Sequence, residues 1–334
     1  MLTYDPQQAD VDPYSLALED MDVSNPYLMA ADVHGRWFKR LRDEAPVHFC
    51  AEAETGPYWS VTRYEDIQYV DTHHDIFSSE PTIVIREPME DFPLPMFIAM
   101  DPPKHEQQRA VVQPAVAPAN LVNFEPIIRE RTVDVLDHLP VGERFNWVEK
   151  VSIELTTRML ATLFDFPFED RHKLTYWSDV STAIPGMGLV ESDEERKEIL
   201  LQCLEYFTGL WNERVNAPPK SDLISMLSHG EATRNMGPVE YMGNLVLLIV
   251  GGNDTTRNSM SASVLALHDN PDQFAKLVSQ QELIPSMVSE AIRWQTPLAH
   301  MRRTVKVDTE LGGHTLRAGE KVIMWYVSGN RDER

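Results

Sequence analysis

The stretch LLIVGGNDTTRN, residues 247–258, begins as a buried helix and then fills its middle with poor helix formers. Each interior glycine costs a helix about 1 kcal/mol relative to alanine, and Asn, Asp and Thr cost a few tenths more. Glycine lets a flat or bulky group lie against the backbone, and a threonine hydroxyl can bond the preceding turn and open the helix locally. We expect Gly251 and Gly252 to make room for such a group and Asp254 and Thr255 to line it. The alternative is a helix crossing, in which the glycines only permit close packing.

Composition limits the classes of protein to consider. The chain has 334 residues, of which 43% are apolar, enough for a sizeable core. Its formal charge of −22 argues against broad binding to nucleic acid or an anionic membrane, though not against a local basic docking patch. Even the most apolar run, residues 245–250, is far shorter than a membrane span, and the acidic start lacks the features of a signal peptide. We therefore expect a soluble, cytoplasmic protein.

Elements along the chain predict a mainly α fold with a small β region (α+β). Without an internal repeat or a long linker, residues 1–334 are expected to form one domain. Late alternating strands need partners, and an early hairpin is the available one. The expected elements are a helix over 25–46, two strands within 47–62, a helix over 65–70, a stack of helices over 105–266, a helix over 285–295 and strands within 304–327.

A proline-broken loop over residues 78–103 is unusually apolar. So many apolar side chains on a loop predict a wall around something hydrophobic. They are Ile83, Val84, Ile85, Met89, Phe92, Met96, Phe97, Ile98 and Met100.

Two charged pairs stand at helical spacing. His105 and Arg109 lie one turn apart after a proline-led helix start and suit a carboxylate or phosphate. Glu290 and Arg293, three residues apart, can form a charge-assisted pair. Either spacing alone is more often a solvated surface feature. His73-His74 is too isolated for a metal site, and the Gly-Gly pairs lack the strand-to-helix context of a phosphate loop.

The order of these motifs resembles the cytochrome P450 superfamily of haem-thiolate monooxygenases. The resemblance runs through almost the whole chain. The stretches GPYWSVT, FIAMDPPKH, LATLFDFPFEDR, LLIVGGNDTTRNSM, IRWQTPLAHMRRT and VIMWYVSGNRDE look like the bacterial family that hydroxylates medium-chain alkanes or fatty acids at the terminal carbon. It implies a cytochrome P450 fold, incomplete at the C-terminus.

The resemblance also implies residue roles. GGNDTT would lie over the distal face of a b-type haem, with Gly251 and Gly252 beside it, the Thr255 hydroxyl near bound O₂ and Asp254 relaying protons; Thr256 has no defined role. His105, Arg109 and Arg303 would bind the haem propionates. Glu290 and Arg293 would form a buried structural network. The implied substrate pocket consists of Met96, Phe97, Leu247, Leu248, Val250, Leu298, Ala299 and Met301, each of which could instead be ordinary core.

The same resemblance implies redox partners for this chain and shows where its sequence differs from the family's pattern. Electrons from NAD(P)H would arrive through a ferredoxin reductase and a ferredoxin, and the substrate would be a hydrophobic small molecule. The sequence stops at SGNRDER, where the family continues to the loop that bears the iron-ligating cysteine, so the axial ligand is expected beyond residue 334. Cys50 and Cys203 show neither that loop sequence nor a pairing pattern, so we expect both to be reduced packing residues.

We expect a partial reading frame with poor haem retention. The alternatives are a relative that hydroxylates terpenes or steroids, and a haem-free lipid-binding or inactive fragment.

Overall fold

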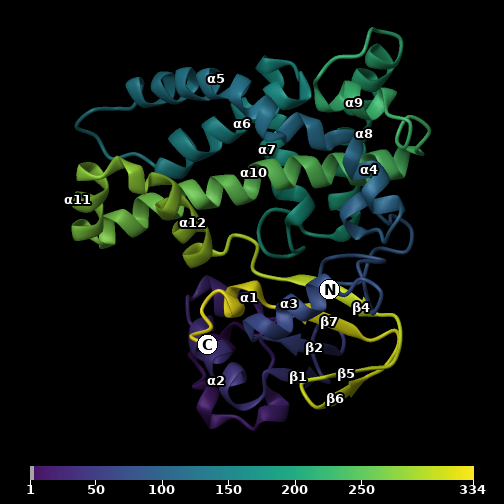
Figure 1. Ribbon diagram of the computed structural model, residues 1–334, viewed down its shortest axis with the longest axis vertical. Coiled ribbons are helices and arrows are strands. Elements are labelled where there is room, and N and C mark those ends of the chain that lie inside the picture. The colour runs from purple at the N-terminus through teal and green to yellow at the C-terminus, as the bar shows by residue number, and fades with distance from the viewer. Residues whose placement is uncertain (1–3) are drawn as a thin grey trace. The chain divides into compact units, whose positions relative to one another are not determined.

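The computed structural model describes residues 4–334, which form two compact units (Figure 1). The sheet unit contains the described residues up to Pro93, together with Ile98–Asp101 and Leu298–Arg334. The helical unit contains Leu94–Phe97 and Pro102–Pro297. The expectation of one domain stays a prediction.

The sheet unit is built on a five-stranded sheet with the strand order β1-β2-β7-β4-β3. β2 pairs with β7 in parallel, and the other neighbours are antiparallel. This confirms that the late strands pair with the early hairpin. The strands are β1 (Val47–Cys50), β2 (Tyr58–Val61), β3 (Phe77–Ser78), β4 (Met301–Val305) and β7 (Lys321–Met324), with a separate hairpin of β5 (Thr309–Leu311) and β6 (His314–Leu316).

Short helices surround this sheet. The single helix expected over 25–46 is wrong in one respect, because Asp32 adopts a left-handed φ of 55° and divides it into α1 and α2. The predicted start is confirmed, since the Asn25 side chain accepts a hydrogen bond from the Tyr27 amide. The helices are η1 (Pro6–Asp10), η2 (Pro13–Ser15), η3 (Leu18–Asp20), α1 (Pro26–Ala30), α2 (His34–Glu44), α3 (Tyr64–Thr72) and α13 (Tyr326–Gly329); η4 (Phe97–Ala99) lies in the loop after β3.

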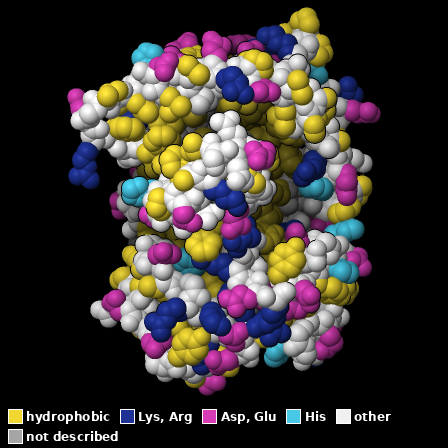
Figure 2. Space-filling model, turned by 60° about the vertical axis from the view of Figure 1, so that its left-hand side comes forward, with side chains coloured by type: hydrophobic (Ala, Val, Ile, Leu, Met, Phe, Trp, Pro, Cys, Tyr) yellow, Lys and Arg dark blue, Asp and Glu magenta, His cyan; other side chains and the backbone are white. Residues whose placement is uncertain are grey.

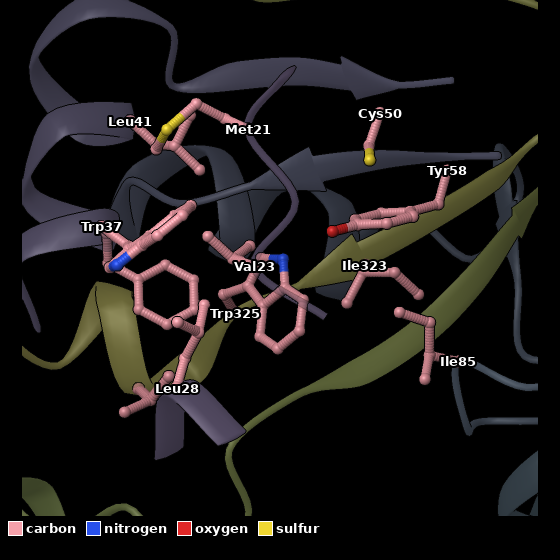
Figure 3. Packing of buried hydrophobic residues seen from close by; sticks show 12 residues of the cluster. Met21, Val23, Leu28, Trp37, Leu41, Cys50, Tyr58, Ile85, Ile323 and Trp325 are labelled. Atoms are coloured by element: carbon pink, nitrogen blue, oxygen red, sulfur yellow. The ribbon is translucent and has the colours of Figure 1, made fainter. Parts of the chain in front are cut away.

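One hydrophobic cluster ties both ends of the chain into the sheet unit (Figure 3). Trp325, 2% exposed, lies in the middle of it, with the ring of Phe38 at 5.2 Å and that of Tyr58 at 6.5 Å. Ile85 from the apolar loop also packs here, so this side chain of the expected hydrophobic wall is part of the protein core. The loop turns this residue inward because a fully buried isoleucine stabilises the core by about 1.5–3 kcal/mol.

The helical unit is organised around α10, the longest helix (Figure 1). α10 packs against α6, α7 and α12 and against a short π-helix, η6. The helix is continuous, so the local opening expected at Thr255 is not present. The elements are α4 (Lys104–Val112), η5 (Gln113–Val116), α5 (Pro118–Asp137), η6 (Val148–Ile153), α6 (Glu154–Phe164), η7 (Phe168–Asp170), α7 (His172–Thr182), α8 (Asp193–Val215), α9 (Leu223–His229), α10 (Pro238–Asp269), α11 (Pro271–Ser279), η8 (Gln281–Leu283) and α12 (Ile284–Gln295).

Hydrophobic side chains gather on the surface of the helical unit, the upper part of the view in Figure 2. α11 and α12 each have an apolar stripe, yet neither contains a buried residue. On α12 the stripe is Ile284, Val288 and Ile292, each between 45% and 47% exposed. Over residues 4–334, every helix is too short or too polar to cross a lipid bilayer.

Candidate active site

The two glycines of α10 have different surroundings. A Cβ on Gly252 would lie 2.7 Å from Cδ2 of Leu160 on α6, so this glycine permits a helix crossing. A Cβ on Gly251 would meet nothing within 4 Å, and this residue is exposed. Gly252 thus follows the helix-crossing alternative, and the prediction that Gly251 makes room for a bound group stays a prediction. Only Gly251 leaves room for a group to lie against the helix backbone.

The Thr255 hydroxyl lies beside this open glycine. It donates a hydrogen bond to the Gly251 carbonyl, 3.0 Å away, as expected for threonine one turn later on a helix. This bond holds the side chain over the open face and leaves the hydroxyl oxygen free to accept. Thr256 is also exposed.

Asp254 points toward α7, away from this open face. Its carboxylate lies 2.6 Å from Arg257, which also pairs with Asp179 at 3.0 Å, and Ser178 is 3.5 Å away. Burial raises the pKa of Asp254, with Asp179 adding to the shift while Arg257 and Ser178 oppose it. The raised pKa suits a carboxyl that takes up and releases protons.

The segment Leu94–Phe97 lies directly on α10. The Phe97 amide donates to Oδ1 of Asn244 at 2.9 Å, and the Pro95 carbonyl occupies the space where Gly243 would carry a Cβ. Phe97 is buried, whereas Met96 is partly exposed. Both were predicted for the substrate pocket, and the structure brings them to the helix that carries Thr255. Asn244 and Gly243 were missed, because an Asn in an apolar helix gives no signal of its partner.

The predicted pocket residues of α10 are not core. Leu247, Leu248 and Val250 are partly exposed, while Leu245 and Ile249 are 0% and 1% exposed and form the packed side of the helix. In the sheet unit, Leu298 is 41% exposed, and Ala299 and Met301 pack partly against the hydrophobic clusters.

On α4, His105 and Arg109 lie one turn apart as expected. Nδ1 of His105 lies 2.7 Å from the Phe97 carbonyl; because a carbonyl only accepts, Nδ1 carries the proton and Nε2 is left for another partner. Arg109 is exposed and forms no ion pair within residues 4–334. Arg109, and His105 when its Nε2 is also protonated, suit carboxylates such as haem propionates.

Strand β4 carries two adjacent arginines. Arg303, predicted to bind a propionate, pairs with Asp71 at 2.6 Å. Arg302 is 4% exposed and pairs at 2.9 Å with Glu87, which also receives Lys321 at 3.2 Å. Lys321 donates in addition to the Ile85 carbonyl at 3.0 Å, so this cluster fixes the apolar loop to the sheet.

Glu290 and Arg293 form the expected pair on α12, with contacts of 2.6 and 2.7 Å. The side chains are 61% and 41% exposed, so residues 4–334 do not bury this pair. The hydrogen bond from Arg293 lowers the pKa of Glu290.

The residues present fit one side of a haem group but do not supply its iron ligand. The open face at Gly251 and the donors of α4 suit the macrocycle and its carboxylates. Burial raises the pKa of Cys50 to about 12 and that of Cys203 well above its ordinary value, so neither is a ready thiolate. No group of three or more His, Cys, Asp or Glu side chains in the described part of the chain is arranged to hold a metal ion.

Known proteins resemble this chain over most of its length. No family model matches it. Linalool 8-monooxygenase from Pseudomonas putida is 34% identical over 95% of this chain and 80% of the relative. Methyl-branched lipid omega-hydroxylase from Mycobacterium tuberculosis is 30% identical over 90% of this chain and 73% of the relative.

Solved structures are closer still. Cytochrome P450-153 from Novosphingobium aromaticivorans is 48% identical with a TM-score of 0.86, and CYP153D17 from a Sphingomonas species is 48% identical with a TM-score of 0.88. Each match covers 95% of this chain and 80% of the solved chain. The predicted superfamily and its mainly α fold are confirmed. The chain therefore belongs to the cytochrome P450 superfamily of haem-dependent monooxygenases.

Proposed function

We propose that this chain is the larger part of a monooxygenase that hydroxylates the terminal carbon of medium-chain alkanes or fatty acids. The observation that carries the proposal is the face of α10, where Leu247, Leu248 and Val250 are partly exposed beside the open Gly251. Such a face offers a hydrocarbon apolar contacts and few hydrogen bonds. A narrow channel along it would present the last methyl group for reaction.

Haem b, when bound, supplies the activation of O₂. The chain's own residues then hold and deliver protons. The Thr255 hydroxyl, anchored on the Gly251 carbonyl, accepts and passes on a proton at Oγ1. Asp254, whose pKa is raised by burial, would hold a proton on the α7 side of the helix, and a water molecule would carry it to the Thr255 hydroxyl. Arg109, and His105 when its Nε2 is also protonated, would hold the propionates, because a carboxylate only accepts. Arg303 remains a predicted propionate ligand.

The proposed enzyme works in the cytoplasm. It receives electrons from NAD(P)H through a ferredoxin reductase and a ferredoxin. A local basic patch is compatible with a chain of net charge −22, because association depends on the field at the docking site.

The test compares two proteins supplied with haem. One is residues 1–334, and the other is a chimera that appends the part of the Novosphingobium relative beyond the matched residues. We expect a thiolate-type Soret band in the carbon monoxide difference spectrum of the chimera alone, and terminal alcohols from octane or octanoate. Absence of the band in both proteins would favour a haem-free lipid-binding protein, which titration with octanoate in the absence of haem would then examine.

The second candidate is a hydroxylase of terpenes or steroids. It is favoured by the 34% identity to linalool 8-monooxygenase and the 30% identity to steroid C26-monooxygenase from Rhodococcus jostii. Incubating the chimera with octane, linalool and a sterol in parallel separates the two candidates. Turnover of linalool or the sterol without octane would refute the alkane assignment.

A further inference from the structure

Asn244 lies on the same face of α10 as Thr255. Asn244, Leu248, Gly251 and Thr255 are spaced by four, three and four residues, which places them on one stripe of a helix with 3.6 residues per turn. The stripe is closed at one end, because Asn244 is fully buried beneath Phe97. It opens toward the other end, where Leu248 and Thr255 are partly exposed and Gly251 is exposed.

The closed end is held by a directed chain of hydrogen bonds. An amide N–H only donates, so the Phe97 amide fixes Oδ1 of Asn244 as its acceptor. Nδ2 of Asn244 then donates to Oε1 of Gln108 at 3.1 Å, and Nε2 of Gln108 donates to Glu240 at 2.6 Å. Asn244 and Gln108 are 0% and 2% exposed, so breaking this chain leaves buried polar atoms without partners.

Two further contacts fix the same segment. The Phe97 carbonyl accepts from Nδ1 of His105, so both polar backbone atoms of Phe97 are bonded. The Pro95 carbonyl is so close to Gly243 that a Cβ there would lie 2.1 Å from its oxygen. Residues 94–97 therefore form a fixed wall rather than a mobile loop, and Met96 is its partly exposed side chain.

We propose that Asn244 is a positioning residue that sets the chain length of the substrate. By fixing Leu94–Phe97 it closes the hydrophobic stripe, whose other end is Thr255. Eleven residues of helix separate Asn244 from Thr255, a length of about 16 Å. A dodecanoyl chain fits this length when extended, whereas a hexadecanoyl chain exceeds it. The inference rests on the proposed function, because it takes an extended hydrocarbon as the substrate.

The test uses the chimera supplied with haem, with residues 1–334 either unchanged (wild type) or substituted, and has two readouts. Calorimetric titration with octanoate, dodecanoate and hexadecanoate measures the chain-length profile, and hydrogen exchange with mass spectrometry follows the Phe97 amide. We expect the wild type to bind dodecanoate about tenfold more tightly than hexadecanoate, since a buried methylene is worth that order of discrimination. Asn244→Leu is expected to bring the two affinities within about twofold and to speed exchange at Phe97 at least about tenfold.

Three further variants make the result specific. Asn244→Asp keeps an acceptor for Phe97 and, when protonated in this buried site, a donor for Gln108, so it should restore both readouts. Asn212→Leu, the same substitution at an exposed position of α8, should change neither. Met96→Ala shortens the wall and leaves the sequence of α10 unchanged. It should raise the affinity for hexadecanoate relative to dodecanoate, and it tests the inference even if Asn244→Leu fails to fold.

The outcomes separate this inference from the proposed function. If the wild type binds fatty acids but Asn244→Leu and Met96→Ala keep its profile, the length inference is overturned and the substrate class stands. Unchanged exchange at Phe97 in Asn244→Leu would overturn the positioning role. If the wild type binds none of the three acids, fatty acids fail as the proposed substrates and the length inference fails with them, whereas turnover of octane by the chimera still tests the alkanes.

Discussion

The hydroxyl of Thr255 donates to the carbonyl of Gly251, 3.0 Å away, on the side of α10 where a Cβ on Gly251 would meet nothing. One turn of helix thus combines an oriented hydroxyl with an uncovered stretch of backbone. Asn253, between them in sequence, is fully buried and accepts from Thr156 of α6 at 2.8 Å. The poor helix formers are therefore divided between two faces, one that packs and one that stays open.

Alanine at the two glycines should have opposite effects. Gly251→Ala is expected to stabilise the chain by about 0.5–1 kcal/mol, because helix propensity improves and nothing is displaced. Gly252→Ala should cost about 1 kcal/mol, since overpacking against the buried Leu160 exceeds that gain. Urea unfolding of both variants measures the difference. In a haem titration of the chimera the order should reverse, with Gly251→Ala binding more weakly. Equal effects of the two substitutions on unfolding would show that the faces are not distinct.

The amino-acid sequence was sufficient to predict those features that depend on residues close together along the chain. The hairpin of β1 and β2, the helix α12 and the spacing of His105 and Arg109 follow from turn residues and periodicity. The division at Asp32 was missed because a left-handed residue interrupts an otherwise helical pattern. The anchoring of Phe97 by Asn244 was missed because it joins residues 147 positions apart. Such a contact depends on how the segments pack, which no spacing rule specifies.

Asp254 should make stability depend on pH in a definite direction. Burial raises its pKa above the ordinary 3.8, so the folded state holds the proton more tightly than the unfolded state. The stabilising contribution is complete below about pH 3.8 and is lost as pH rises through the folded pKa. We therefore expect the unfolding free energy of the wild type, relative to Asp254→Asn, to fall as pH rises from 4 and then level off. Urea unfolding over this range measures it. A difference that grows with pH would mean that the ion pair with Arg257 outweighs burial.

Two carboxylates should differ in their contribution to stability. Glu290→Gln is expected to cost under about 0.5 kcal/mol in residues 1–334, because its pair with Arg293 is largely exposed. Glu87→Gln should cost about 1–2 kcal/mol, since it removes the carboxylate that faces Arg302 and Lys321, both 5% exposed at the side chain. We expect less than the roughly 3–5 kcal/mol typical of breaking a buried ion pair, because Glu87 is itself 60% exposed. Chemical unfolding measures both costs.

The chimera provides the contrast for Glu290. If appended residues bury its pair with Arg293, Glu290→Gln should cost about 3 kcal/mol there. The cost of Glu87→Gln should stay the same. An unchanged effect of Glu290→Gln in the chimera would mean that the pair is a surface feature in the longer protein as well.

The apolar stripe of α12 should make residues 1–334 associate. Ile284, Val288 and Ile292 recur every fourth residue and are 45–47% exposed, so they form a continuous patch of the kind that drives association. We expect Val288→Gln/Ile292→Gln to shift the sedimentation coefficient toward that of the monomer and to reduce binding of a hydrophobic dye. Unfolding free energy should change by under about 0.5 kcal/mol, because substitutions at exposed positions rarely do more. Val141→Gln, at an isolated residue 98% exposed, is the matched control and should alter neither readout. A wild-type chain that is monomeric and binds no dye would contradict the prediction, since about half of each stripe residue would then face water without consequence.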